Sequence, residues 1–273
     1  MAFKDLLVLA GAGTEPASTY ALWLAGACGA TLTAAAPVIE PSVPAYVMAE
    51  MPDDVLDRIR DDAEASATAA LEAVSADAQR TGLTLETLRF RATPNSVGDV
   101  LARAARCYDL TILPQPDPTG VDTSDIVEAV LFGSGRPLMI VPYIRARSDS
   151  RRVLVAWDGG EPAARAVSQA LPILEKARHV EILTVGEDAG SRPFLSGHDL
   201  ARHLGRHGIT AEPRHVVGGD IGVADLMLSH AADIGADLIV MGGYGHSRLR
   251  EIVLGGATRE ILRSMTVPVL MSH

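Results

Sequence analysis

An internal repeat limits the possible folds of this chain more than any other feature of its sequence. An apolar run followed by a small-residue turn and Glu-Pro-Ala occurs near the start and again after the midpoint, and two later segments recur in the same order. Because the three pairs recur in the same order, the sequence predicts a tandem duplication joined near 146–151. The pairs are LLVLAGAGTEPA with VLVAWDGGEPA (6–17, 153–163), ARCYDLTILPQ with DIGADLIVMGG (105–115, 233–243), and SDIVEAVLFGSGRPLMIV with GGATREILRSMTVPVLMS (124–141, 255–272).

Each repeat alternates short apolar runs, typical of strands, with amphipathic helical patterns. Strands that alternate with helices form βαβ units, so we expect an α/β fold with two tandem doubly wound domains, each a parallel sheet with helices on both faces. The predicted domains are 1–145 and 151–273, joined by the linker RARSDSRR. In the second domain we expect strands at 152–157, 179–185, 211–217, 237–242 and 267–271, and helices at 161–176, 197–207, 222–234 and 256–265. The first domain follows the same order, with a longer second helix near 53–82, whose acidic, alanine-rich composition predicts a solvated helix.

Composition excludes several classes of partner. A net charge of −10 repels phosphate backbones, so we expect no nucleic acid. The uncharged stretch from Pro16 to Ile39 has the hydropathy of a membrane span, but its glycines, threonines and proline favour a buried helix, turn and strand, so we expect no membrane partner. Cys28 and Cys107 have no metal or disulfide spacing, which favours buried free thiols in a reducing cytoplasm.

The glycine-rich segment MGGYGHSRLREIVLGGATREIL (241–262) marks the candidate ligand site. In a doubly wound sheet, ligands bind beyond the carboxyl ends of the strands, where this segment, the turn AWDGG (156–160) and Val185 are expected to meet. The first glycines let a ligand approach the main chain, and the last two precede a helix whose N-terminal N–H groups attract phosphate. The alternative is that these glycines only form tight turns.

The spacing Gly242-x2-Gly245-x9-Gly255 resembles the nucleotide signature of the universal stress protein family, G-x2-G-x9-G-[S/T]. The segment GHSRLREIVLGGATREIL, with VPVLM after it, is similar to the usual C-terminal sequence of that family, and VLVAWDGGEPAARA is similar to its first strand and Asp-Gly turn. The resemblance is strong across 152–273 and weaker across 1–145. It implies a Rossmann-like domain with a five-stranded sheet of order 3-2-1-4-5. It also implies that the domain binds an adenine nucleotide, ATP or else AMP or ADP, with or without Mg²⁺.

The resemblance also implies a set of nucleotide contacts in the second domain. Asp158, with Ala156 beside it, would contact the ribose or the base. The main chain of Val185 would contact adenine, and Met241 and Gly242 would contact the ribose. The phosphates would be bound by the main-chain N–H groups of Gly245, Gly255, Gly256 and Ala257. Gly256 stands where the family has Ser or Thr, so the hydroxyl contact to phosphate is missing, and Thr258 or Ser247 is a candidate substitute. His246 lies inside the glycine loop, where it either contacts phosphate or is a turn residue without a role in binding.

The first domain departs from the family pattern, so we expect it to be a degenerate partner that does not bind ATP. Gly11 takes the place of Asp158, and PQPDPTGVDTSD (114–125) replaces the glycine loop with prolines, which lack N–H donors, and with acids, which repel phosphate. The family implies that the two halves pack as an intramolecular pseudo-dimer through their last strands, 137–142 and 267–271. Two chains can then associate as a homodimer.

Other motifs give weaker signals. His203 and His207 share one face of a predicted helix, which is compatible with zinc, but a solvated helix face is the more common meaning of that spacing. No P-loop or nucleophile elbow occurs, so we expect at most slow ATP hydrolysis. The sequence therefore predicts a cytoplasmic, nucleotide-binding regulatory module of the stress response. The alternatives are a weak ATPase and a nucleotide-free scaffold for another small ligand or a protein partner.

Overall fold

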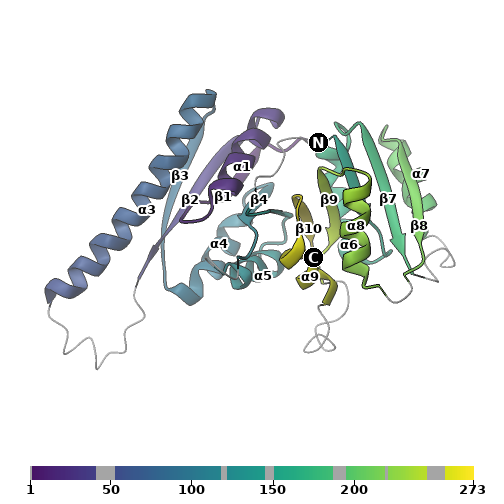
Figure 1. Cartoon of the computed structure of the whole chain (residues 1–273). Helices are drawn as coiled ribbons and strands as arrows, with labels where there is room; N and C mark the ends of the chain where they lie inside the picture. Colours follow the sequence, from purple (N-terminus) through teal and green to yellow (C-terminus); the bar gives the residue numbers. More distant parts are fainter. Residues whose placement is uncertain are drawn as a thin grey trace. The chain divides into compact units, whose positions relative to one another are not determined.

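The computed structural model describes residues 2–40, 53–117, 122–144, 151–186, 195–218, 221–244 and 256–273. Contacts between residues divide the chain into two compact units, which we call the N-terminal unit (Phe3–Arg136) and the C-terminal unit (Pro137–His273 with Ala2). Each unit has helices packed on a sheet that is mostly parallel, as the repeat predicted (Figure 1). Within the described ranges, none of the helices is both long and apolar enough to cross a membrane.

The N-terminal unit is a parallel sheet in which the strands follow the order β3-β2-β1-β4. Its strands are β1 (Asp5–Leu9), β2 (Thr31–Ile39), β3 (Leu85–Ala92) and β4 (Leu110–Pro114). Its helices are α1 (Glu15–Cys28), α3 (Asp53–Thr81), a short 3-10 turn (Pro94–Ser96), α4 (Val97–Ala105) and α5 (Ser124–Gly133). Helix α3 packs along β2 and contacts α1, whereas α4 packs against α5.

The long helix α3 is amphipathic rather than solvated on all sides. Its side chains at Ala67, Leu71, Val74 and Ala78 are buried at intervals of three or four residues, which places them on one face toward the sheet. The length predicted from the sequence is confirmed, but the prediction of a solvated helix is wrong for this face. Alanine-rich composition hid the stripe because alanine carries little hydrophobic contrast.

The C-terminal unit holds the second repeat, with the parallel strand order β8-β7-β6-β9-β10 that the family resemblance implied. Its strands are β6 (Arg152–Ala156), β7 (His179–Val185), β8 (Ala211–Val216), β9 (Leu238–Gly242) and β10 (Val269–Ser272). Its helices are α6 (Glu161–Leu174), α7 (Gly197–Arg206), α8 (Val223–Asp233) and α9 (Gly256–Ser264). The predicted strands and helices of this repeat are confirmed to within two residues at each end.

Strand β5 (Leu138–Val141) comes from the first repeat but belongs to the C-terminal unit, where it pairs with β10 in the antiparallel direction. Leu270 lies opposite Met139, which is its own counterpart in the repeat. All four residues of β5 are buried. The pairing therefore joins the corresponding last strands of the two repeats.

An aspartate before the fourth strand of each repeat fixes the start of the first strand. In the N-terminal unit, Asp109 Oδ2 accepts hydrogen bonds from the main-chain N–H groups of Lys4 (2.7 Å) and Asp5 (3.1 Å). In the C-terminal unit, Asp237 Oδ2 accepts one from Arg152 N–H at 3.1 Å. The recurrence of Asp-Leu in the two repeats is thus explained by a structural role at the amino edge of the sheet, away from the candidate site.

Both cysteines lie in the described part of the chain, and neither forms a disulfide. Cys28 is half-buried at the end of α1, whereas Cys107 is exposed. The prediction that both thiols are buried is wrong, because Cys107 lies in the turn after α4, beyond the residues that face the sheet.

Candidate functional site

The candidate site begins in the loop after β6. The Asp158 carboxylate accepts a hydrogen bond from Gly160 N–H at 2.8 Å, and Gly160 is the N-cap residue of α6. Asp158 is exposed, and Ala156 before it is half-buried at the end of the strand. Asp158 therefore has a structural task at the start of α6, where the helix dipole favours a negative charge, while one face of its carboxylate remains open to solvent.

Trp157 connects this loop to the segment before α7, and the sequence analysis did not single it out. Its main-chain N–H donates to the Leu183 carbonyl at 2.9 Å, and its indole Nε1–H donates to the Leu195 carbonyl at 2.8 Å. Gly159, with a φ of 76°, lies under Leu195, whose Cβ would be 3.1 Å from a Cβ at position 159. The sequence feature that could have indicated this role is the aromatic residue Trp157 directly before the Asp-Gly turn.

The end of β7 provides the next part of the site. Val185 is half-buried, and the following residue, Gly186, has a φ of 121° that favours glycine. Gly186 N–H donates to the Val216 carbonyl at 3.0 Å, and the Gly186 carbonyl accepts from His215 Nε2 at 2.6 Å. Since a carbonyl only accepts, this contact requires that His215 Nε2 carry the proton.

Gly242 ends β9 directly against the first turn of α6. A Cβ at this position would lie 2.6 Å from Ala163 N and 2.9 Å from the Pro162 carbonyl carbon, both main-chain atoms. Met241 before it is buried at 6% exposure. The absence of a side chain at Gly242 is thus required by packing inside the protein, and this requirement is independent of any ligand.

The start of α9 is held beside the end of β9 by one hydrogen bond. Tyr244 N–H donates to Thr258 Oγ1 at 3.2 Å, and both residues are buried. Tyr244 adopts a φ of 52°, which is uncommon for a residue other than glycine. The Thr258 hydroxyl, one candidate substitute for the missing phosphate contact, therefore already has a partner in the protein.

Gly256 and Ala257 are exposed at the first turn of α9, and a Cβ at position 256 would meet no atom within 4 Å. Their N–H groups are at the end of the helix that carries partial positive charge. Four of the expected contact residues lie outside the described residues, namely Gly245, His246, Ser247 and Gly255. The described part brings together the ends of β6, β7 and β9 at the carboxyl edge, with α9 joined to β9.

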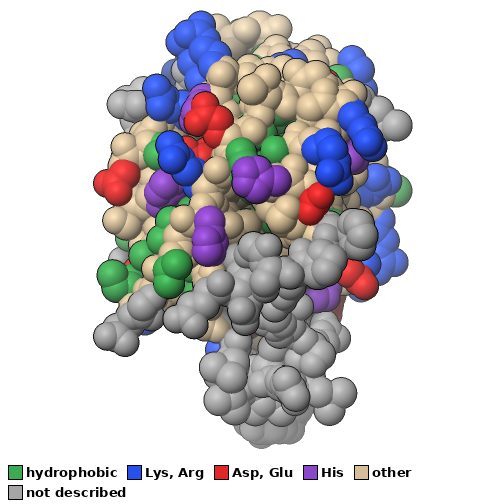
Figure 2. All heavy atoms as spheres, turned by 90° about the vertical axis from the view of Figure 1, so that its right-hand side faces the viewer, with side chains coloured by type: hydrophobic (Ala, Val, Ile, Leu, Met, Phe, Trp, Pro, Cys, Tyr) green, Lys and Arg blue, Asp and Glu red, His purple; other side chains and the backbone are tan. Residues whose placement is uncertain are grey.

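The described histidines are all in the C-terminal unit, and several are visible on the face that carries α7 and β8 (Figure 2). The rings of His203 and His207 pack edge to face, with their centroids 5.0 Å apart. Among the residues that the structure describes, no three histidine, cysteine, aspartate or glutamate side chains come together in a group that could hold a metal ion. The spacing of His203 and His207 is explained by this ring contact on an exposed helix face.

Glu181 is a buried carboxylate that the sequence analysis missed. It lies in β7 with 3% exposure and contacts Nε2 of His230 from α8, and His179 Nε2 is 3.7 Å away. A buried carboxylate needs such partners to offset the loss of water. Period-two patterning could not reveal it, because an acidic residue at a core position reads as an interruption of the strand.

Comparison with known proteins finds a family match in the C-terminal part of the chain. Residues 187–273 match the model of the universal stress protein family. This part of the chain therefore carries a universal stress protein domain. A universal stress protein from Synechocystis is 26% identical over 146 residues, which are 53% of this chain and 49% of that protein, so the match spans about half of the relative's length.

Solved structures of universal stress proteins share the fold over nearly the whole chain. One from Archaeoglobus fulgidus has a TM-score of 0.74 at 20% identity and covers 97% of both chains. A second, from Pseudomonas aeruginosa, has a TM-score of 0.61 at 15% identity and covers 98% of this chain and 92% of the other. A tandem arrangement of two universal stress protein repeats in one chain is consistent with this coverage.

Proposed function

We propose that the C-terminal unit binds an adenine nucleotide, ATP or else ADP or AMP, and that the chain acts as a cytoplasmic regulatory module of the stress response. The Tyr244–Thr258 hydrogen bond is the observation that carries the proposal. It holds the N-terminus of α9 beside the carboxyl end of β9, which is where a phosphate would meet helix N–H groups in a doubly wound sheet. In the sequence, Gly245 and Gly255 of the glycine signature lie between Tyr244 and Thr258.

Each proposed contact follows from the chemistry of its residue. Asp158, exposed at the end of the neighbouring strand β6, can accept hydrogen bonds from ribose hydroxyls. Gly256 and Ala257 offer main-chain N–H groups to the phosphates, and Mg²⁺ would be held mainly by phosphate oxygens. Thr258 Oγ1 accepts the hydrogen bond from Tyr244 N–H, which leaves its own O–H as a donor, so Thr258 and Ser247 are both proposed for the hydroxyl contact to phosphate.

The remaining proposed contacts complete the binding site. They are adenine against the main chain of Val185, the ribose against Ala156, Met241 and Gly242, and the phosphates against Gly245, Gly255 and His246. For Gly242 the proposal asks only that the ligand lie along a main chain whose lack of a side chain is already required by α6. The N-terminal unit has no equivalent of Asp158 or of the glycine loop, so we propose one nucleotide per chain.

We further propose that the repeats 1–145 and 151–273 form an intramolecular pseudo-dimer and that two chains can associate. The antiparallel pairing of β5 with β10 supports this, because corresponding strands that pair antiparallel are related by a local two-fold axis. A measured molecular mass in solution tests the homodimer. A mass equal to one chain at all concentrations would exclude it.

The nucleotide proposal is tested by denaturing extraction of the freshly purified chain, followed by identification of the released small molecules. We expect about one adenine nucleotide per chain, as the family fold binds one ligand at its switch point. The double variant Gly245→Asp, Gly255→Asp should release none, since two carboxylates at the phosphates repel them. Gly205→Asp is the matched control, because position 205 is exposed on α7 and a side chain there meets no atom within 4 Å.

The alternatives give different outcomes in the same experiment. Steady-state ATP hydrolysis that falls in an Asp158→Ala variant would support a weak ATPase. Asp158 is the residue to replace because it is the only acid in the described loop after β6. The absence of nucleotide from the wild-type chain, with no uptake of added ATP and Mg²⁺, would refute nucleotide binding and favour a scaffold for another ligand.

A further inference from the structure

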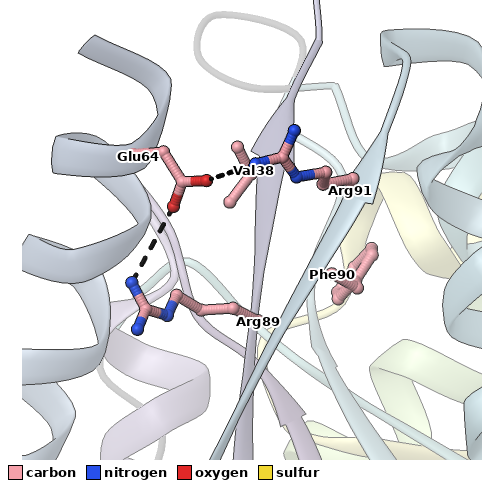
Figure 3. Close-up of a pocket in the computed structure, with 5 residues that line it drawn as sticks. All are labelled: Val38, Glu64, Arg89, Phe90 and Arg91. Carbon is pink, nitrogen blue, oxygen red and sulfur yellow. Dashed lines mark hydrogen bonds and ion pairs between the residues drawn. The ribbon is translucent and has the colours of Figure 1, made fainter. Parts of the chain in front are cut away.

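The N-terminal unit contains a pocket of about 290 Å³ that is separate from the candidate nucleotide site. It is lined by Val38 from β2, Glu64 from α3, and Arg89, Phe90 and Arg91 from β3 (Figure 3). It lies near the carboxyl ends of β2 and β3. The buried stripe of α3 begins at Ala67, and one turn earlier the same face of the helix presents Glu64, so the apolar contact between helix and sheet gives way to a polar pocket.

Strand alternation turns both arginines toward α3. Arg89 and Arg91 are two residues apart on β3, so their guanidinium groups leave the same face of the sheet, while the Phe90 ring points away from Glu64 (Figure 3). Glu64 Oε1 is 3.1 Å from Arg91 Nη2, and Glu64 Oε2 is 3.8 Å from Arg89 Nη1. One carboxylate is therefore shared by two guanidinium groups.

The two arginines are not equally satisfied by this carboxylate. Arg91 also contacts Glu40 Oε1 at 3.3 Å and is held between two acids. Among the described residues, Arg89 makes a long hydrogen bond of 3.5 Å to Thr68 Oγ1 and a 3.8 Å ion pair with Glu64, and no other contact of this kind. The Arg89 guanidinium thus retains donor capacity toward the pocket.

The ion pairs of this network are weak enough for a ligand to replace them. The side chains of Arg89, Arg91 and Glu64 are 56%, 67% and 39% exposed, and ion pairs of that exposure contribute little to stability because water competes for both partners. Carboxylate and phosphate oxygens both form charge-assisted bonds with guanidinium groups, but a phosphate monoester carries nearly twice the negative charge of Glu64 at neutral pH. A phosphate that takes the position of the Glu64 carboxylate would therefore be attracted more strongly by the two arginines than Glu64 is.

The second repeat lacks this arrangement. The aspartates before β4 and β9 align the two sheets, because Asp109 binds the N–H of Asp5 and Asp237 binds the N–H of Arg152. From this alignment the strand pairing makes Arg89 equivalent to His215 and, two residues further on, Arg91 equivalent to Val217. The C-terminal unit thus has an imidazole and an exposed valine where the N-terminal unit has two guanidinium groups. The paired cations are a property of the N-terminal unit alone, so the nucleotide proposal does not explain them.

We propose that this pocket binds a phosphate monoester with a small apolar group, with the phosphate between Arg89 and Arg91 and the apolar group against Val38. Two guanidinium groups match the charge and the several oxygens of a phosphate better than the single charge of a carboxylate. The volume exceeds that of inorganic phosphate, which leaves room for the organic group. In this arrangement Glu64 occupies the anion position when the ligand is absent and is displaced when it binds.

The test is calorimetric titration of the full chain with phenyl phosphate, with benzoate and inorganic phosphate as comparison probes. The titrations use the Gly245→Asp, Gly255→Asp background, so that the C-terminal unit does not contribute and the two proposals fail independently. We expect saturable binding of phenyl phosphate at one site, weaker binding of inorganic phosphate and weaker binding of benzoate. Tighter binding of benzoate would overturn the assignment to a phosphate.

Variants of the pocket should move the affinity in opposite directions. Arg89→Ala with Arg91→Ala should weaken phenyl phosphate at least tenfold, whereas Glu64→Gln should strengthen it by roughly two- to fivefold because the competing carboxylate loses its charge. Arg58→Ala is the matched control, since Arg58 is an exposed arginine of the same unit that pairs with Asp54. Absence of saturable binding, or equal affinity in the double arginine variant, would refute the proposal.

Discussion

Replacing Gly242 with alanine separates two reasons for a glycine at the end of β9, namely packing inside the protein and the approach of a ligand. The added Cβ would lie 2.6 Å from Ala163 N and 2.9 Å from the Pro162 carbonyl carbon. Both are main-chain atoms of the first turn of α6, so no side-chain rotation relieves the contact. The helix start or the strand end must move by several tenths of an ångström.

The size of the effect follows from known costs of overpacking. Inserting one methyl group into a packed site typically destabilises a protein by about 1–3 kcal/mol. Gly→Ala also removes conformational freedom from the unfolded chain, which contributes about 0.4–1 kcal/mol in the other direction. We therefore expect Gly242→Ala to lower the free energy of unfolding by about 1–2 kcal/mol, or the Tm by roughly 2–8 °C for a chain of this size.

Thermal and urea unfolding of the nucleotide-free protein measure this effect, with Gly256→Ala as the control. Position 256 also belongs to the glycine signature, but a Cβ there meets no atom within 4 Å, so its stability should be unchanged or slightly higher. If Gly242→Ala unfolds at the same temperature as the wild type, the packing argument is wrong. The glycine would then be needed only for a ligand.

Further substitutions test buried polar groups and the cap of α7. The described residues supply no hydrogen-bond partner for the buried hydroxyl groups of Thr33 and Thr111. Thr33→Val and Thr111→Val should therefore each raise the free energy of unfolding by up to about 1 kcal/mol in urea titrations, and a loss of stability would show that the hydroxyls are satisfied in solution. His230→Ala leaves the buried Glu181 carboxylate without its closest partner and should destabilise the C-terminal unit by about 2–4 kcal/mol. His203→Ala, at an exposed position, is the control and should change the stability little. Equal effects of the two variants would contradict the pairing of Glu181 with His230. Hydrogen bonds from the Ser196 side chain and main chain lower the pKa of Asp199. The contribution of Asp199 to the free energy of unfolding is therefore present above the ordinary carboxyl pKa and is lost as the pH falls through the folded pKa. Asp199→Asn should flatten the acid side of the profile of stability against pH, and an unchanged profile would refute this.

The sequence determined the architecture of each repeat because local patterns carry that information. Short apolar runs between helical patterns located the strands of the C-terminal unit to within two residues, and the position of Asp158 in the turn after β6 followed from the same pattern. The glycine spacing likewise pointed to the end of β9 and the start of α9, where Gly242 and Gly256 lie. A pattern of residue types along the chain is enough where the physical cause is local periodicity.

Only the tertiary structure decided what these residues contact. Gly242 meets α6, the Thr258 hydroxyl meets Tyr244, and Glu181 meets His230, each across at least 14 positions of sequence. The shared carboxylate of the Arg89 and Arg91 pocket likewise comes from a helix 25 or more residues earlier. Partners brought together from distant elements leave no periodic trace in either segment, because the contact depends on how a helix and a strand pack and not on the order of residues within either one.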